Sequence, residues 1–341
     1  MNLTAVEEEE SCTQPSNFSC FETASLTAVD VLMYSAAAAV VLLTVCGNLL
    51  VIISICHFRQ LHTPTNLLLL SLAVADLLVG VLVMPFHFST LIQSYWCFGA
   101  VFCLIWNLAS FHLSCVSVYN VTFIAMDRYF ALSNPFLYAT KITVRVTLMI
   151  TSIFWLYSLF YNFALLYFNG NIIDVKENVA CAGQCSATID EVWATVDFVT
   201  VFILPCLIML MLYLKIFAIA KYHANAIRCT RKQQQAECTQ KSNHSTASER
   251  KAAKRAAILI LVFFLCLVPY YITVFLSLYI RKASAYVAIT ATLILVNMNS
   301  SLNPLIYALF YTWFQKCVKL IVTLQIRSAN SSLTDVLSRG N

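Results

Sequence analysis

Charged residues are scarce in this sequence. Only 11% of the 341 residues are Asp, Glu, Lys or Arg, whereas a soluble domain carries about 25%. This scarcity excludes a disordered chain, a nucleic-acid-binding protein with a broad basic surface, and an ordinary water-soluble enzyme. Glycine, with 6 residues, and proline, with 7, are also few, which excludes low-complexity and loop-rich architectures.

Apolar residues are abundant instead, and they occur in long blocks. They make up 60% of the chain, and the mean hydropathy is +0.78. A helix needs about 20 mostly apolar residues to cross a bilayer. Seven blocks meet this need: 33–56, 66–92, 101–126, 146–168, 192–219, 256–280 and 285–310. None has the alternating pattern of a barrel strand, so we predict an all-α membrane protein with a seven-helix bundle at 33–310.

Basic residues are distributed unequally between the two sides of this predicted bundle. One set of connections holds only Lys176, Arg281 and Lys282, while the other holds a cluster at 221–255 and most other Lys and Arg residues. Cytoplasmic loops carry such an excess. We therefore expect residues 1–32 outside the cell and the C-terminus in the cytoplasm. Two Asn-x-Ser/Thr patterns on the outer side predict glycosylation, at Asn2 and Asn17.

Six of the 14 cysteines lie where the predicted topology permits oxidation: Cys12, Cys20, Cys97, Cys103, Cys181 and Cys185. Cys103, at the outer end of the third block, would form a disulfide with Cys185 in the loop after the fourth. A second bridge would join Cys181 to the N-terminal segment, through Cys12 or Cys20. No CxxC pair or His/Cys cluster indicates a metal site.

Carboxylates inside a membrane are costly, so each one suggests a functional site. Asp76 lies in the second block, Asp127 at the inner end of the third, and Asp197 in the fifth. We expect Asp76 to join a polar network around a water molecule or a sodium ion, with Ser117, Asn299 and Asn303. An ion relay in a transporter is the alternative, but neither internal repeats nor matched broken helices accompany these residues.

Each block also carries a sequence landmark in a fixed order. The landmarks are Gly47-Asn48, Leu72-Ala73-Val74-Ala75-Asp76, Asp127-Arg128-Tyr129, Trp155, Pro205, Pro269 and Asn303-Pro304-Leu305-Ile306-Tyr307. With these, nearly the whole chain resembles rhodopsin-like (class A) G-protein-coupled receptors. The ending Tyr311-Thr312-Trp313-Phe314 and the loop 181–185 are similar to those of trace amine-associated receptors in particular.

This resemblance implies a function as well as a fold. It implies a multi-pass plasma-membrane receptor for small, volatile amines, active in olfaction, which couples to a stimulatory or olfactory heterotrimeric G protein and cyclic AMP. It implies that Cys20 is the partner of Cys181. It implies neither an enzyme nor a cofactor, apart from the sodium ion near Asp76. Retinal is excluded because no lysine lies between Lys282 and Lys316.

The sequence departs from the pattern of amine receptors at the ligand site. Their ammonium-binding aspartate of the third helix is replaced here by Ser110. Asp197 lies eight residues before Pro205, about 12 Å nearer the outside by helix rise, and resembles the fifth-helix aspartate of a fish-type subset. We expect Asp197 to pair with the ammonium; the alternative is a water-exposed polar residue near a helix start. Residues that would complete the cavity are Phe111, Ser114, Phe198, Val201, Tyr270, Tyr271 and Asn297.

A second departure lies in the sixth block, where Leu267 stands in place of the usual Trp two residues before Pro269. Pro269 still interrupts the helical hydrogen bonds, and Phe263 below it remains to repack. On the cytoplasmic side we expect Arg128 to pair with Asp127 and with Glu249. The remaining residues that the resemblance assigns to activation and coupling are Tyr129, Asn303, Pro304 and Tyr307.

After the seventh block, residues 311–324 have the apolar stripe and basic flank of an interfacial helix on membrane lipids, and 325–341 form a tail. Cys317 is a candidate for palmitoylation. Ser110 leaves open a receptor of the same fold for a lipid or peptide, and a transporter is a weaker alternative.

Overall fold

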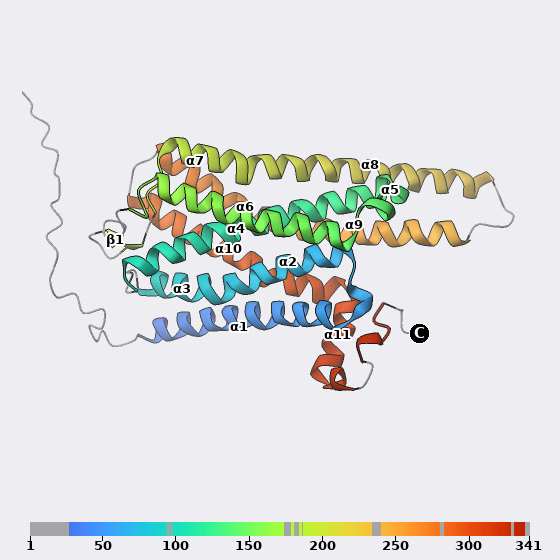
Figure 1. Ribbon diagram of the computed structural model, residues 1–341, viewed down its shortest axis with the longest axis horizontal. Coiled ribbons are helices and arrows are strands. Elements are labelled where there is room, and N and C mark those ends of the chain that lie inside the picture. Colours follow the sequence, from blue (N-terminus) through green and yellow to red (C-terminus); the bar gives the residue numbers. More distant parts are fainter. Residues whose placement is uncertain are drawn as a thin grey trace, which may run out of the picture.

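The computed structural model describes residues 27–93, 96, 98–173, 179–180, 184–185, 187–233, 240–279, 283–328 and 331–337. Seven helices in this part are long and apolar enough to cross a membrane, which confirms the predicted bundle. Their spanning parts are Ala28–His57, Pro64–Gln93, Ala100–Ser133, Val144–Phe168, Glu191–Ile219, Ala253–Ser277 and Val287–Phe310. They lie side by side along the long axis of the molecule (Figure 1).

Two of the seven spans contain a π-helical turn, and the other five are regular α-helices. The first is α1 (Ala28–His57); the second joins α2 (Pro64–Leu78), the π-helical η2 (Val79–Val83) and α3 (Met84–Gln93). The third and fourth are α4 (Ala100–Ser133) and α6 (Val144–Phe168). The fifth joins α7 (Glu191–Asp197), the π-helical η3 (Phe198–Ile203) and α8 (Leu204–Gln233). The last two are α9 (Gln240–Tyr279) and α10 (Ala283–Phe310).

Local sequence explains where several helices begin. Thr27 and Asp30 form a reciprocal capping box at the start of α1, and the side chains of Thr63 and Thr143 cap α2 and α6. Such oxygens satisfy backbone N–H groups that have no partner within the helix. The Asp190 carboxylate does the same for Val192 and Trp193, and so begins α7 at a fixed point, seven residues before Asp197.

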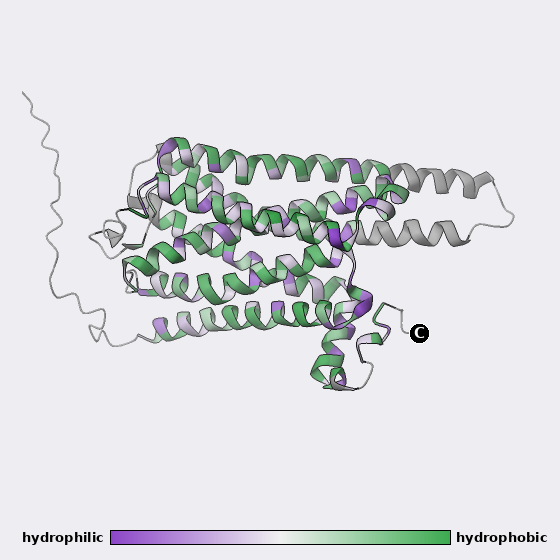
Figure 2. Ribbon diagram, viewed as in Figure 1, coloured by the Kyte–Doolittle hydropathy of each residue, from purple (hydrophilic) through white to green (hydrophobic). Residues whose placement is uncertain are grey.

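The bundle has apolar side chains on its outer surface and polar side chains inside, as a lipid environment requires. Figure 2 shows that hydrophobic residues predominate along the spanning helices. On the outer surface of the bundle, the side chains of Phe160 and Phe217 are 69% and 70% exposed. The interior instead holds polar side chains, including Asn48, Asp76 and Asn303. Polar groups in a membrane protein lie inside the bundle, where they find partners.

Gly47 permits a close approach of two helices, α1 and α10. A Cβ atom at this position would lie 2.7 Å from Cβ of Pro304, which is below van der Waals contact. The glycine therefore fits a place where only a hydrogen is tolerated.

The two ends of the bundle hold different elements. The disulfide end holds a short antiparallel hairpin of β1 (Val179–Ala180) and β2 (Gln184–Cys185). The Arg128 end holds η1 (Arg59–Leu61), α5 (Pro135–Lys141) and α11 (Thr312–Val322). Beyond α11 come η4 (Gln325–Arg327) and η5 (Ser331–Leu333), and α11 runs across the direction of the spanning helices (Figure 1).

Residues 331–337 fold back on the Arg128 end. The hydroxyl of Ser331 lies 3.0 Å from Nε2 of His57, and the backbone N–H of Val336 donates to Gln60 at 3.1 Å. Residues 331–337 thus pack beside η1, a contact that the sequence does not predict.

Candidate ligand-binding site

A cavity of about 320 Å³ opens among the helices toward the disulfide end. Helices α3, α4, α6, α7, α9 and α10 and the segment η3 contribute to its wall. Most of the predicted ligand contacts line it: Ser110, Phe111, Ser114, Asp197, Phe198, Val201, Tyr270 and Tyr271. Asn297 does not line this cavity. It lies in the wall of a smaller space that Ser110, Ser114 and Leu267 also border.

The predicted Cys103–Cys185 disulfide is present, with Cα atoms 5.6 Å apart. It ties β2 to α4, and Cys185 lines the cavity. Asn107 lies 3.4 Å from both sulfur atoms through its amide nitrogen. This link places the hairpin beside the cavity mouth. The predicted partners Cys20 and Cys181, the alternative Cys12, and the acceptors Asn2 and Asn17 lie outside the described residues.

Asp197 is the last residue of α7 and is partly buried in the cavity wall. The hydroxyl of Tyr161 donates to its Oδ1 at 3.2 Å. Among the described residues that line the cavity, Asp197 is the only one with a carboxylate, and none is a lysine or an arginine. The site therefore offers a single negative charge with unused acceptor capacity.

The wider turn of η3 directly follows Asp197. The backbone carbonyl of Thr200, within η3, accepts a hydrogen bond from Tyr119 of α4 at 3.2 Å. π-Helical turns occur often at functional sites. Here the Tyr119 hydroxyl of the neighbouring helix α4 binds a carbonyl of the π-helical turn. The sequence shows no signal for η3, because β-branched and aromatic residues such as these also occur in regular membrane-spanning helices.

Aromatic rings form the wall next to Asp197. Phe198 stacks on Phe275 with ring centroids 4.7 Å apart, and Phe202 stacks on Tyr271 at 4.3 Å. Ring faces attract cations and pack against alkyl and aryl groups. A cation with an apolar body would therefore meet complementary surfaces here.

Several polar residues of the wall were not predicted, and His87 is one of them. His87 of α3 lines the cavity, and its Nδ1 lies 2.8 Å from the amide nitrogen of Asn297. The sequence signal that could have found it is a histidine inside an apolar spanning block. The prediction considered the carboxylates and several neutral polar residues of the spans, but not this histidine.

The polar network around Asp76 lies deeper in the bundle. Asn303 donates to Oδ2 of Asp76 at 2.7 Å, and Asn48 donates to backbone carbonyls of Thr44 and Ser300. Oδ1 of Asp76 and Oδ1 of Asn299 are buried without a hydrogen-bond partner in the described part of the chain. Ser117 lies nearby in the wall of the smaller space, with Asn299. These oxygen acceptors are of the type that water molecules and hard cations use.

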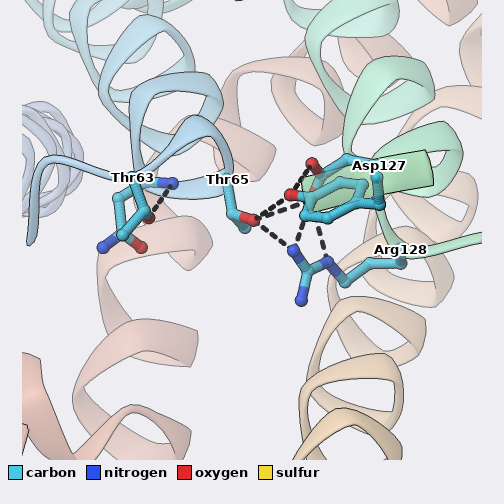
Figure 3. Close-up of polar contacts among 6 residues, drawn as sticks. Thr63, Thr65, Asp127 and Arg128 are labelled. Atoms are coloured by element: carbon cyan, nitrogen blue, oxygen red, sulfur yellow. Dashed lines mark hydrogen bonds and ion pairs between the residues drawn. The ribbon is translucent and has the colours of Figure 1, made fainter. Parts of the chain in front are cut away.

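Asp127 and Arg128 form an ion pair at the opposite end of the bundle. Figure 3 shows the Thr65 hydroxyl beside both side chains: it donates to Asp127 at 2.7 Å and also lies in contact with the guanidinium. The hydroxyl of Tyr138, on α5, donates to the other carboxylate oxygen at 2.6 Å. The Asp127–Arg128 pair was predicted, whereas Thr65 and Tyr138 were not.

Comparisons with known proteins agree with this architecture. Residues 47–307 match the model of the rhodopsin family of 7 transmembrane receptors. Trace amine-associated receptor 13c of Danio rerio is 38% identical over 97% of this chain and 98% of its own length. Trace amine-associated receptors 7f and 9 of Mus musculus are 36% and 37% identical, over 99% and 96% of this chain and 95% of each of their own lengths. The chain belongs to the trace amine-associated receptor family. It is therefore a receptor and not an enzyme.

The residues that were expected to take part in activation lie in the core, inside α9 and α10, and near the Arg128 end. Phe263 and Leu267 are buried in the core, and Pro269 and Pro304 lie inside α9 and α10. Tyr307 is fully buried and its hydroxyl has no hydrogen-bond partner among described residues. Tyr129 faces Lys215, whose Nζ lies 5.8 Å from the ring centroid. Glu249 belongs to α9, but its side chain lies outside the described part, so its contact with Arg128 stays a prediction.

Cys317 occupies a different environment from the one that the sequence suggested. It lies in α11 beside Trp313 and Phe314 and is 0% exposed. Burial raises the pKa of its thiol to about 11, which disfavours the reactive thiolate. Acylation needs an accessible thiolate, so we do not propose palmitoylation at this residue. The apolar face of α11 packs against the receptor and thereby covers Cys317.

Proposed function

We propose that this receptor detects small monoamines and that Asp197 binds their ammonium group. The main observation behind this proposal is that Asp197 supplies the single carboxylate in the described wall of the cavity. A second support is that its relatives are trace amine-associated receptors. The Tyr161 hydroxyl would hold one oxygen of Asp197 in place and leave the carboxylate free to accept from the ligand.

The cavity chemistry favours a charged and largely apolar ligand. An ammonium at Asp197 would form a charge-assisted hydrogen bond, and the rings of Phe198 and Tyr271 would pack against the ligand's carbon chain. Ser110, in the position of the family's usual aspartate, offers no second negative charge. A diamine would then bring a second ammonium into a cavity without a counter-charge, and a monoamine should bind better.

We further infer the orientation and the coupling partner. The disulfide end would face the oxidising outside of the cell, and the basic Arg128 end the cytoplasm. The release of Arg128 from Asp127 would then accompany binding of a heterotrimeric G protein of the stimulatory or olfactory type, which raises cyclic AMP. Olfactory neurons are the proposed site of action. The oxygen atoms of Asp76, Asn299 and Ser117 would hold a sodium ion or water molecules in the resting receptor.

The test is the amine response of cells that produce Asp197 variants. Cyclic AMP is measured against hexylamine for the native receptor, Asp197→Glu, Asp197→Asn and Asp197→Ala, with surface receptor counted in each case. Loss of a desolvated charge partner costs about 2–5 kcal/mol, so the neutral variants should lose potency by about thirtyfold or more. Asp197→Glu should keep a weaker response. Glu191→Gln, on the same helix but outside the cavity wall, is the matched control.

Two outcomes separate this function from the alternatives. Ser110→Asp should improve the response to a diamine relative to a monoamine, because it adds a second counter-charge. Full potency of hexylamine on Asp197→Ala at normal surface level would reject the amine site. A receptor for a neutral ligand, such as a lipid, would then be the better account, since Ser110 and the aromatic wall carry no charge.

A further inference from the structure

His87 and Asn297 form a polar pair at the boundary of the ligand cavity, on α3 and α10. His87 is 2% exposed and Asn297 3%. The His87 ring stacks on Trp106, with ring centroids 6.4 Å apart. Neither residue has a part in the binding of an ammonium by Asp197. The buried pair therefore needs a separate explanation.

The hydrogen bond between them fixes the tautomer of the imidazole. An amide nitrogen can only donate, and the Asn297 nitrogen lies 2.8 Å from Nδ1 of His87. Nδ1 must accept this bond, so the proton of the neutral ring is on Nε2. Nε2 makes no hydrogen bond of normal geometry to the described residues.

We propose that His87 is a second ligand contact, which donates a hydrogen bond from Nε2 to an ether or hydroxyl oxygen of the ligand. This inference rests on the proposed function, since Asp197 would bind the other end. In Figure 1, α7 and α3 lie well apart at the disulfide end. The two anchors would therefore engage opposite ends of one molecule. The preferred ligand is an amine with an oxygen acceptor remote from its nitrogen.

The physical reason is the cost of an unpaired buried donor. A polar hydrogen that has left water without a new partner destabilises the complex, and a ligand oxygen removes that penalty. A second ammonium cannot do so, because it only donates. His87 should thus discriminate against diamines as well as favour oxygenated monoamines.

The experiment compares ligands that differ only at the far end. The linear amines from butylamine to octylamine are each paired with the methoxy-amine and the hydroxy-amine of equal heavy-atom count. At the length that fits, both oxygenated ligands should act on the native receptor at an about three- to tenfold lower concentration than the plain amine, as expected for one hydrogen bond. The methoxy group only accepts, so its gain identifies Nε2 as the donor.

Variants assign the effect to the residue. His87→Leu should abolish the oxygen advantage and keep the response to the plain amine, and His87→Gln should retain part of it. Thr90→Val is the matched control, because Thr90 also lines the cavity but its hydroxyl is bonded to Phe86; it should keep the full advantage. The response of each variant to the plain amine shows that it folds and signals.

Three results would overturn the proposal. These are no advantage at any chain length, an advantage that survives His87→Leu, and a gain for the hydroxyl ligand alone, which would place an acceptor at Nε2. The first two leave the function of Asp197 intact. If instead the plain amines act without need of Asp197, the proposed function fails and the His87 contact fails with it.

Discussion

The hydroxyl of Tyr138 should hold the receptor in its resting state through Asp127. The donor–acceptor distance is 2.6 Å, and burial, together with the charge of Asp127, raises the pKa of Tyr138 to about 12. A raised tyrosine pKa means that the donated bond is complete below about pH 10 and lost only as pH rises through about 12. The bond is therefore intact at any pH used in a cell assay.

Tyr138→Phe removes this bond without a change in ring size. A hydrogen bond to a charged group contributes about 1.5–3 kcal/mol, and Tyr138 is only partly buried, so water would replace some of it. We take the lower value, which corresponds to about a tenfold shift in a two-state equilibrium. If Asp127 must release Arg128 during activation, the active fraction without ligand should rise by about tenfold.

The assay is basal cyclic AMP per surface receptor in the absence of amine. Thr65→Val should act in the same direction, because Thr65 also donates to Asp127. Thr140→Val is the control on the same short helix, since its hydroxyl bonds only to backbone carbonyls of Phe136 and Leu137. Unchanged basal signalling in both test variants, at normal surface level, would refute the idea that these hydroxyls restrain Arg128.

Three further predictions concern the frame of the receptor. Cys103→Ser should abolish surface expression, measured by antibody on intact cells, because it frees β2 from α4; normal surface level and amine response would contradict this. Gly47→Ala should destabilise the purified receptor by about 1–3 kcal/mol through overpacking against Pro304, seen as a lower thermal unfolding midpoint; an unchanged midpoint would mean that the helices yield freely. Glu249→Ala should raise basal cyclic AMP if Glu249 restrains Arg128, and an unchanged basal level would limit Glu249 to a surface role.

The seven spans were predictable because long apolar blocks have few alternative folds, and the depth of Asp197 followed from helix rise and Pro205. Contacts between distant helices were less accessible. The pairing of His87 with Asn297 depends on how α3 and α10 are rotated, which hydropathy does not determine. The π-helical turns of η2 and η3 likewise had no sequence signal, since residues of these types also occur in regular membrane-spanning helices.

Burial of individual side chains was also hard to foresee. Cys317 lies on the apolar face of α11, and an apolar face can pack either on lipid or on protein. The structure packs Trp313, Phe314 and Cys317 against the bundle, and the interfacial position of α11 stays a prediction. Thr65 and Tyr138 carried no signal, because isolated hydroxyls near helix ends are common and their partners lie on other helices.

The claim that Asp197 recognises charge is tested most directly by a cycle of two ligands and two receptors. Hexylamine and hexanol have nearly the same shape, and only the amine is a cation. Their half-maximal concentrations for cyclic AMP are measured on the native receptor and on Asp197→Asn. The pairing of a desolvated carboxylate with a cation predicts that the native receptor prefers the amine by about thirtyfold or more, and that Asp197→Asn shows nearly equal responses. An amine preference of the same size in both receptors would contradict the account.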